Sequence, residues 1–247
     1  MANLTFVQAD LSLMSTARKL GTELPAADVV FLSNGIIAPA KRTVTEEGIE
    51  VDMAVSTLSR LVILEELAPR LPAGARVFIW GMPGNLPAAR DARLDDLNAE
   101  QGYAADFGFQ HMNTVVANEA LVHHLASLPS LKEANVAVFG MNPGMLLTAI
   151  RTSHGMPSCI ECCVSCCFCP PPVPVYGESV AALAFTPGLE ARTGALFGQD
   201  CSFIKPMPIF TAGKASELYA ALQVLSKGTK QGVQGHPLVE APKSVTM

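Results

Sequence analysis

The sequence predicts an α/β fold, a doubly wound and mostly parallel sheet with helices on both faces. Two observations lead to this prediction. Short apolar runs, of the length of buried strands, alternate with much longer segments that have helical spacing. Parallel strands need long crossover connections, usually helices, so this alternation is typical of them.

The expected strands are short, and most end in polar or glycine-rich residues. They cover residues 4–9, 28–32, 75–80 and 134–140, with a further strand near 194–197. In parallel α/β sheets, ligands bind outside the carboxyl ends of the strands. We therefore expect a functional site near Asp10 and near the loops that begin at Ser33, Gly81 and Met141.

Helical spacing fills the segments between and after these strands. The expected helices run from a Ser12 cap to about residue 23, from the turn at 45–48 to Pro69, from about 104 to 127, near 178–186 and over 214–226. These elements predict a single domain over residues 1–227. Residues 228–247 are rich in glycine, glutamine and proline, and we expect a mobile tail there.

Composition excludes several classes of protein. Hydrophobic residues make up 49% of the 247 residues and charged residues only 16%, which suits a folded domain with a sizeable core. The net charge of -5 argues against a nucleic-acid partner. No secretory signal is visible, and no apolar stretch reaches the roughly 18 residues of a membrane span. We therefore expect a cytoplasmic protein with reduced thiols, and the sequence leaves open whether it forms a homo-oligomer.

Several motifs, taken in order, resemble the short-chain dehydrogenase/reductase family, whose fold is Rossmann-type. They are ADLS (9–12), FLSNGI (31–36), TEEGIEVDMAVSTLSRLVIL (45–64), ARVFIWG (75–81), NTVVANEALVHHLA (113–126) and NPGMLLTAI (142–150), with a weaker match over 176–197. The resemblance covers roughly residues 4–152. It implies NAD- or NADP-dependent redox chemistry on a small carbonyl or alcohol substrate.

The resemblance also implies which residues would bind the cofactor. Asp10 and Leu11 would lie beside the adenine, and Asn34 with Gly35 would shape the loop under the cofactor. The residues near the nicotinamide would be Pro143, Gly144 and Thr148. From the residues alone two other interpretations stay open, because an aspartate after a strand is often a helix cap and Pro-Gly is often a turn.

One departure from the family concerns the cofactor. The family begins with a strand and a Gly-x-x-x-Gly-x-Gly turn, which receives the cofactor pyrophosphate at a helix N-terminus. This sequence begins at what resembles the third strand of the family, so we expect an N-terminally shortened sheet and weak or absent binding of NAD or NADP. We also expect residues 4–9 to pair in parallel beside residues 28–32, joined by a right-handed crossover.

A second departure concerns catalysis. At the positions of the family's Tyr-x-x-x-Lys pair the sequence has His111 and Val115, and Ser56 stands at the helix asparagine. Gly81 or Met82 stands at the serine that follows the third matched strand of the family. His111 could act as a general acid, but valine supplies neither charge nor hydrogen bond, and a helix histidine is more often a packed or solvated side chain. The expected function is an impaired or inactive oxidoreductase. The alternative is a non-catalytic descendant that binds other proteins.

Six of the seven cysteines lie within residues 159–169, directly before a run of prolines. The family resemblance is interrupted over 153–175, where the family has a lid over the substrate. Overlapping Cys-x-x-Cys spacings could bind zinc, but the pairs are closer together than in zinc modules. Lipidation and redox sensing are further alternatives. We expect an aberrant lid region and no bound metal.

Overall fold

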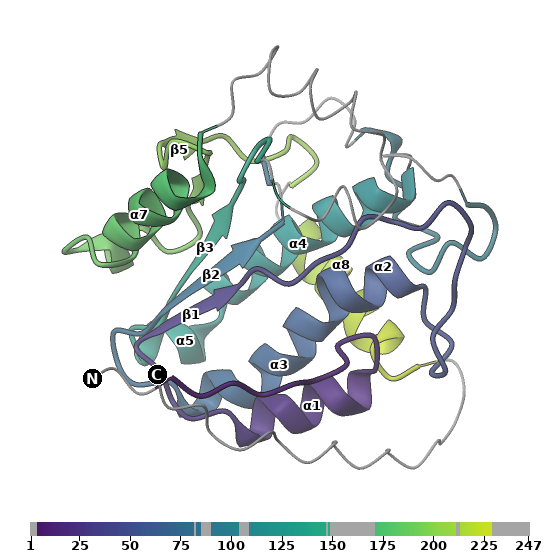
Figure 1. Ribbon diagram of the computed structural model, residues 1–247, viewed down its shortest axis with the longest axis horizontal. Coiled ribbons are helices and arrows are strands. Elements are labelled where there is room, and N and C mark those ends of the chain that lie inside the picture. Colours follow the sequence, from purple (N-terminus) through teal and green to yellow (C-terminus); the bar gives the residue numbers. More distant parts are fainter. Residues whose placement is uncertain are drawn as a thin grey trace.

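A five-stranded sheet forms the centre of the molecule (Figure 1). The computed structural model describes residues 4–81, 83–84, 90–103, 109–146, 148, 171–210 and 213–228. The strands lie in chain order: β1 (Val29–Leu32), β2 (Arg76–Trp80), β3 (Ala137–Met141), β4 (Leu196–Phe197) and β5 (Phe203–Ile204). The first four are parallel and β5 is antiparallel to β4. The predicted mostly parallel α/β sheet is confirmed.

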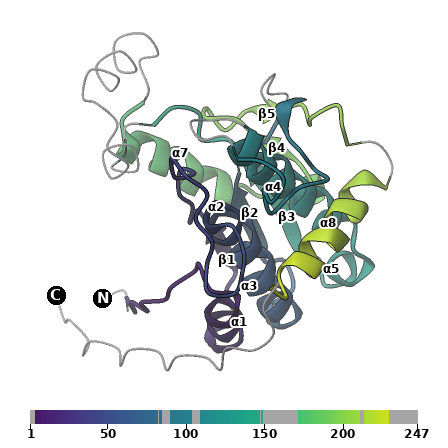
Figure 2. The same cartoon turned by 90° about the vertical axis from the view of Figure 1, so that its right-hand side faces the viewer.

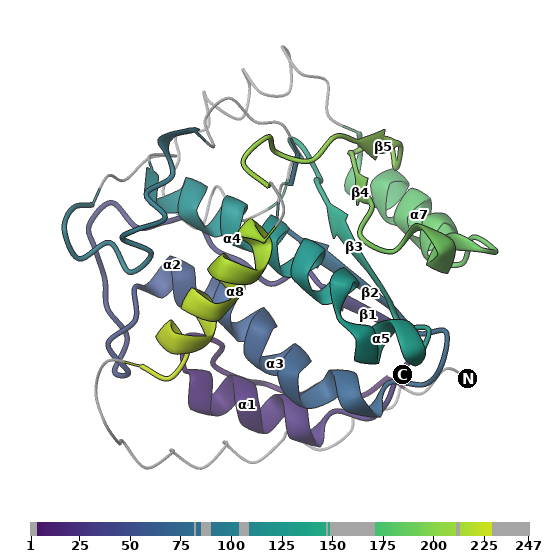
Figure 3. The ribbon, with the colours of Figure 1, turned by 180° about the vertical axis from the view of Figure 1, so that it is seen from behind.

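Helices cover both faces of this sheet, as Figure 2 shows from the side. On one face α3 (Ser59–Leu67) and α4 (Phe109–Ser127) pack on apolar side chains of β2, such as Val77 and Ile79. Outside them lie α1 (Met14–Glu23) against α3 and α8 (Lys214–Leu225) against α4, both in front of the strands in Figure 3. On the other face α7 (Val173–Ala184) packs on Phe78 and Phe139.

The helix expected between residues 45 and 69 contains a turn that the sequence does not reveal. It begins as α2 (Val51–Met53), passes through a π-helical turn (Ala54–Leu58), and continues as α3 to a 3-10 turn (Ala68–Arg70). In the π-helical turn the N–H of Ser59 donates to the carbonyl of Ala54, five residues earlier. Such turns occur frequently at functional sites.

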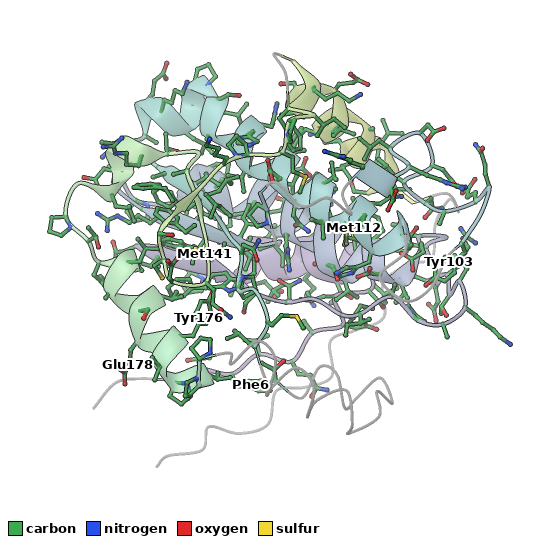
Figure 4. The ribbon with its side chains drawn as sticks, turned by 90° about the horizontal axis from the view of Figure 1, so that it is seen from above. Phe6, Tyr103, Met112, Met141, Tyr176 and Glu178 are labelled. Carbon is green, nitrogen blue, oxygen red and sulfur yellow. The ribbon has the colours of Figure 1, made fainter. Side chains whose placement is uncertain are left out.

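Residues 4–9 do not form a strand, so this prediction is wrong. Leu4, Phe6 and Val7 are exposed by 94%, 71% and 47%, and Figure 4 shows Phe6 at the periphery. Among the described residues β1 pairs only with β2, so the expected pairing beside residues 28–32 is absent as well. An apolar run becomes a strand only where a neighbour takes up its backbone hydrogen bonds, and this run has no such neighbour.

The start of α1 also differs from its prediction. Leu13, and not Ser12, is the N-cap, and the N–H groups of Met14 and Ser15 donate to the Glu47 carboxylate. A residue distant in the sequence therefore caps this helix, and its negative charge lies at the positive end of the helix dipole.

The remaining expected elements are present with shifted ends. Among the described residues three short ones were not expected: α5 (Pro129–Glu133), a 3-10 helix (Leu189–Arg192) and the antiparallel strand β5. Residues 151–170, with six of the seven cysteines, and residues 229–247 of the expected tail lie outside the described residues. Within the described segments no helix is both long and apolar enough to cross a membrane.

Candidate functional site

A cavity of about 520 Å³ lies at the carboxyl ends of β1, β2 and β3. Its lining includes six of the residues singled out in the sequence: Gly35, Ser56, His111, Pro143, Gly144 and Thr148. These residues come from four separate segments, and the parallel sheet brings them together because the carboxyl ends of its strands share one edge. The volume lies in the usual range for a small-molecule site.

Asn34 lies beside this cavity and holds the loop after β1 against the π-helical turn. Its side-chain nitrogen donates to the Val55 carbonyl (2.8 Å) and to Ser59 Oγ (2.9 Å). Asp10 and Leu11 do not line the cavity: Asp10 accepts from the Ser12 N–H in a local turn, and Leu11 packs against the main core. Asp10 is not the helix cap that the residues alone left open, because the N-cap of α1 is Leu13.

Ser56 and His111 meet through a buried carboxylate that the sequence analysis did not single out. Asp52 is fully buried; its Oδ1 accepts from Ser56 Oγ (2.6 Å), and its Oδ2 lies 3.3 Å from His111 Nδ1. Ser56 Oγ also accepts from the Ile36 N–H (3.0 Å). The single hydroxyl proton of Ser56 is therefore directed to Asp52.

Arg60 supplies a second charge on the cavity wall, one turn after Ser56. Its Nη1 donates to Asn118 Oδ1 (2.8 Å), and its Nη2 donates to the Asn34 carbonyl. Burial lowers the pKa of Arg60 to about 9, and the nearby Asp52 partly opposes this effect. Asp52, Ser56 and Arg60 recur every four residues, so they form a polar stripe within an otherwise apolar helix. That spacing is the signal that could have identified them.

Asn118 explains why the family's serine cannot stand at Gly81. A Cβ atom on Gly81 would lie 2.3 Å from the Asn118 Cβ, closer than side chains approach one another. The other candidate position, Met82, lies outside the described residues. Val115 lines the cavity as expected, one turn after His111, and brings no charge.

The tyrosine on the cavity wall is Tyr176 of α7, which lies near Met141 in Figure 4. Its hydroxyl accepts from Trp80 Nε1 (3.1 Å), and burial is the main cause that raises its pKa to about 12. Tyr103 lies on the opposite side in that view. A phenol with so high a pKa is a weak proton donor near neutral pH.

A second buried carboxylate, Glu50, lies close to Asp52. Its Oε2 accepts from the Met53 N–H (2.8 Å) and from Gln110 Nε2 (2.7 Å), while its Oε1 and Gln110 Oε1 have no partner. Burial raises the pKa of Glu50, and the Asp52 charge adds to the rise. Both unpartnered atoms are acceptors, so a proton on Glu50 Oε1 would supply the donor that this pair lacks.

Comparison with known proteins found a relative that matches most of the chain. The chain is 34% identical over 223 residues to an uncharacterized oxidoreductase of Saccharomyces cerevisiae, which covers 84% of this chain and 69% of that protein. No family model matches the chain.

Solved structures share the fold at lower identity. A short chain dehydrogenase family protein from Francisella tularensis has a TM-score of 0.53, 16% identity and coverage of 80% of each chain. A 3-oxoacyl-[acyl-carrier protein] reductase from Brucella melitensis, in complex with NAD, has a TM-score of 0.57 and 15% identity, covering 81% of this chain and 77% of its own.

Proposed function

Because this chain belongs to the short-chain dehydrogenase/reductase family, we propose that it interconverts a carbonyl compound and an alcohol with NAD or NADP, slowly, in the cavity described above. The observation that carries the proposal is the cavity itself. It gathers Ser56, His111, Pro143, Gly144 and Thr148 at the carboxyl ends of the parallel strands.

Among the described residues, those of the cavity suit one end of such a cofactor. Gly35 lines the cavity, and a Cβ there would take up space at ordinary contact distance, 3.4 Å from Arg60 Nη2 and 3.5 Å from Ser56 Oγ. That space suits the nicotinamide and its ribose. For the pyrophosphate, α7 begins at the cavity with Val173, but the next residue, Pro174, has no N–H to donate. Weak cofactor binding is therefore part of the proposal.

The bound cofactor would supply or accept the hydride. The chain must then move a proton at the substrate oxygen, and His111 is the cavity residue best suited to this task. Asp52 binds its Nδ1, which orients the ring and directs proton transfer through Nε2. Ser56 donates its hydroxyl hydrogen to the same carboxylate, so its oxygen can accept a hydrogen bond from the hydroxyl of an alcohol substrate. No lysine assists here, because Val115 takes that position.

The test is consumption of NADH or NADPH with a panel of aldehydes, ketones and oxo acids. We expect slow turnover with at least one cofactor, and at least about a 100-fold loss in His111→Phe, as for removal of a general acid. His124→Phe is the matched control on the same helix, since His124 packs on Tyr219 and bonds Ser216, away from the cavity. No turnover with either cofactor across the panel contradicts the proposal and favours the non-catalytic alternative.

A further inference from the structure

Arg60 is a buried cation, and no described carboxylate forms an ion pair with it, although Asp52 acts on it electrostatically from nearby. The residue is 3% exposed and lines the cavity. Its two hydrogen-bond partners, Asn118 Oδ1 and the Asn34 carbonyl, are neutral oxygens, and among the described residues its Nε has no partner. In the part of the chain that the structure describes, the guanidinium forms no ion pair. Burying a charge without a counter-charge is costly, so an anion in the cavity would relieve that cost.

The guanidinium is also held in one position. Asn118 Nδ2 donates to the Ser56 carbonyl (2.9 Å), Thr57 Oγ1 (3.1 Å) and the Thr114 carbonyl (2.7 Å). These three bonds fix the orientation of the amide, so its oxygen must face Arg60. A group held in place before the ligand arrives binds more tightly, because less freedom is lost on binding.

Asp52, the carboxylate that acts on Arg60 electrostatically, is engaged elsewhere. Its two oxygens meet Ser56 and His111. With a pKa of about 9, Arg60 is still mainly charged at neutral pH. The positive charge is thus available to a ligand.

The rest of the lining defines the other part of that ligand. Ile36, Ile37, Trp80, Leu146 and Tyr176 give the cavity an apolar and partly aromatic wall. An apolar wall with one buried cation matches a molecule with an apolar body and one acidic group. A planar carboxylate suits a guanidinium better than other anions, because two parallel hydrogen bonds can form.

We propose that the cavity binds the carboxylate of an apolar or aromatic carboxylic acid at Arg60. One consequence rests on the proposed redox function: the substrate is then an oxo or hydroxy acid with an apolar or aromatic body. Binding of the acid itself does not depend on redox chemistry, so it can be measured without cofactor.

The experiment compares phenylacetate with its neutral analogue phenylacetamide by calorimetric titration of the full chain at neutral pH. We expect the acid to bind at least tenfold more tightly than the amide. Arg60→Met should remove this preference. Arg76→Met is the matched control and should keep it, because Arg76 pairs with Glu190 and the Ala184 carbonyl, away from the cavity.

The affinities of the wild-type chain for phenylacetate and phenylacetamide test the proposal even if Arg60→Met fails to fold. Equal affinity for acid and amide overturns the proposal. Displacement of phenylacetate by an equal concentration of inorganic phosphate also overturns it, since the cation would then serve a phosphate group. Acid preference without any cofactor turnover supports carboxylate binding and separately contradicts the proposed redox function.

Discussion

The polar residues of the segment 50–60 lie inside the apolar core, and each depends on a particular partner. Asp52 needs the Ser56 hydroxyl and His111, and Arg60 needs Asn118. Removing one member leaves the other buried and unsatisfied, which costs more than the bond itself contributes. The two unpartnered acceptors on Glu50 and Gln110 already show such a deficit.

Glu50→Gln tests this deficit at the scale of a single residue. The new amide can donate to Gln110 Oε1 and still accept from the Met53 N–H, so both orphan acceptors are addressed. Because burial raises the pKa of Glu50 above its usual 4.5, ionisation costs folded-state stability as the pH rises through the raised value. We expect Glu50→Gln to raise the free energy of unfolding by about 1 kcal/mol or more at pH 8.

The gain should disappear below the usual glutamate pKa, where Glu50 is protonated in both the folded and the unfolded chain. Urea unfolding at a series of pH values measures this dependence. Glu178→Gln on the exposed face of α7 is the control and should show no such trend. A gain that is constant with pH would mean that shape, and not charge, causes it.

At the scale of elements, a close approach between two helices fixes where α1 lies on α3. A Cβ on Gly21 would lie 2.9 Å from the Glu66 Cβ and 2.9 Å from the Ile63 carbonyl oxygen. Backbone cannot yield as a flexible side chain can, so the two helices must separate to admit even a methyl group. Arg70 strengthens the contact by donating to the Gly21 and Leu24 carbonyls.

We expect Gly21→Ala to lower the free energy of unfolding by about 1–3 kcal/mol because of this overpacking. Gly177→Ala in α7 is the matched control, since nothing lies within 4 Å of its added Cβ. That change should instead raise stability by about 0.5–1 kcal/mol, as alanine favours the helix. Thermal unfolding of both variants measures the difference, and a stabilised Gly21→Ala chain would contradict the close contact.

A second element-scale prediction concerns Glu119, which joins α4 to two loops. Its carboxylate accepts from the Gly84 N–H and the Met207 N–H, both at 2.6 Å, and the side chain is fully buried. Glu119→Leu leaves both donors unpaired, so we expect a loss of about 2–6 kcal/mol in the free energy of unfolding. A loss below that range, measured by urea unfolding, would show that water replaces the carboxylate.

The sequence predicted best those elements whose pattern can be recognised within a few neighbouring residues. Residues 28–32, 75–80 and 134–140 are apolar runs ended by turn residues, and each contains a strand. Residues 4–9 have the same pattern, yet whether they become a strand depends on a neighbour that the pattern does not contain. The π-helical turn was missed because, over one turn, its apolar spacing resembles that of an α-helix.

The residues of the site also divide into those with a local sequence signal and those whose position depends on distant neighbours. Gly35, Pro143 and Gly144 were predictable from their place after strands in a parallel sheet. Asp52 and Arg60 were missed: their spacing of four residues from Ser56 marks a polar stripe, but it does not reveal which neighbour each side chain will face. Only the packing of α3 against α4 brings Arg60 to Asn118.

At the scale of the whole molecule, the sheet has an uncovered edge at β1. Val30 and Leu32 pack toward the main core, whereas Phe31, against Phe78 and Trp80 on the other face, is 46% exposed. Because the Asp28 carbonyl accepts from the Arg76 N–H, the backbone groups of Phe31 point away from β2.

The last prediction concerns cofactor affinity. Trp80 is the single tryptophan of the chain and lines the cavity, so its fluorescence reports on any ligand that enters. We expect the described cavity residues to contact the nicotinamide end, while Pro174 offers no N–H donor at the adjoining helix start. We therefore expect NADH and NADPH to quench Trp80 with a dissociation constant above about 0.1 mM. Nicotinamide mononucleotide, which lacks the adenosine half, should bind nearly as well as the full cofactor. Micromolar affinity for NADH or NADPH, or a large advantage of the full cofactor over the mononucleotide, would mean that the chain holds the pyrophosphate and adenosine as well.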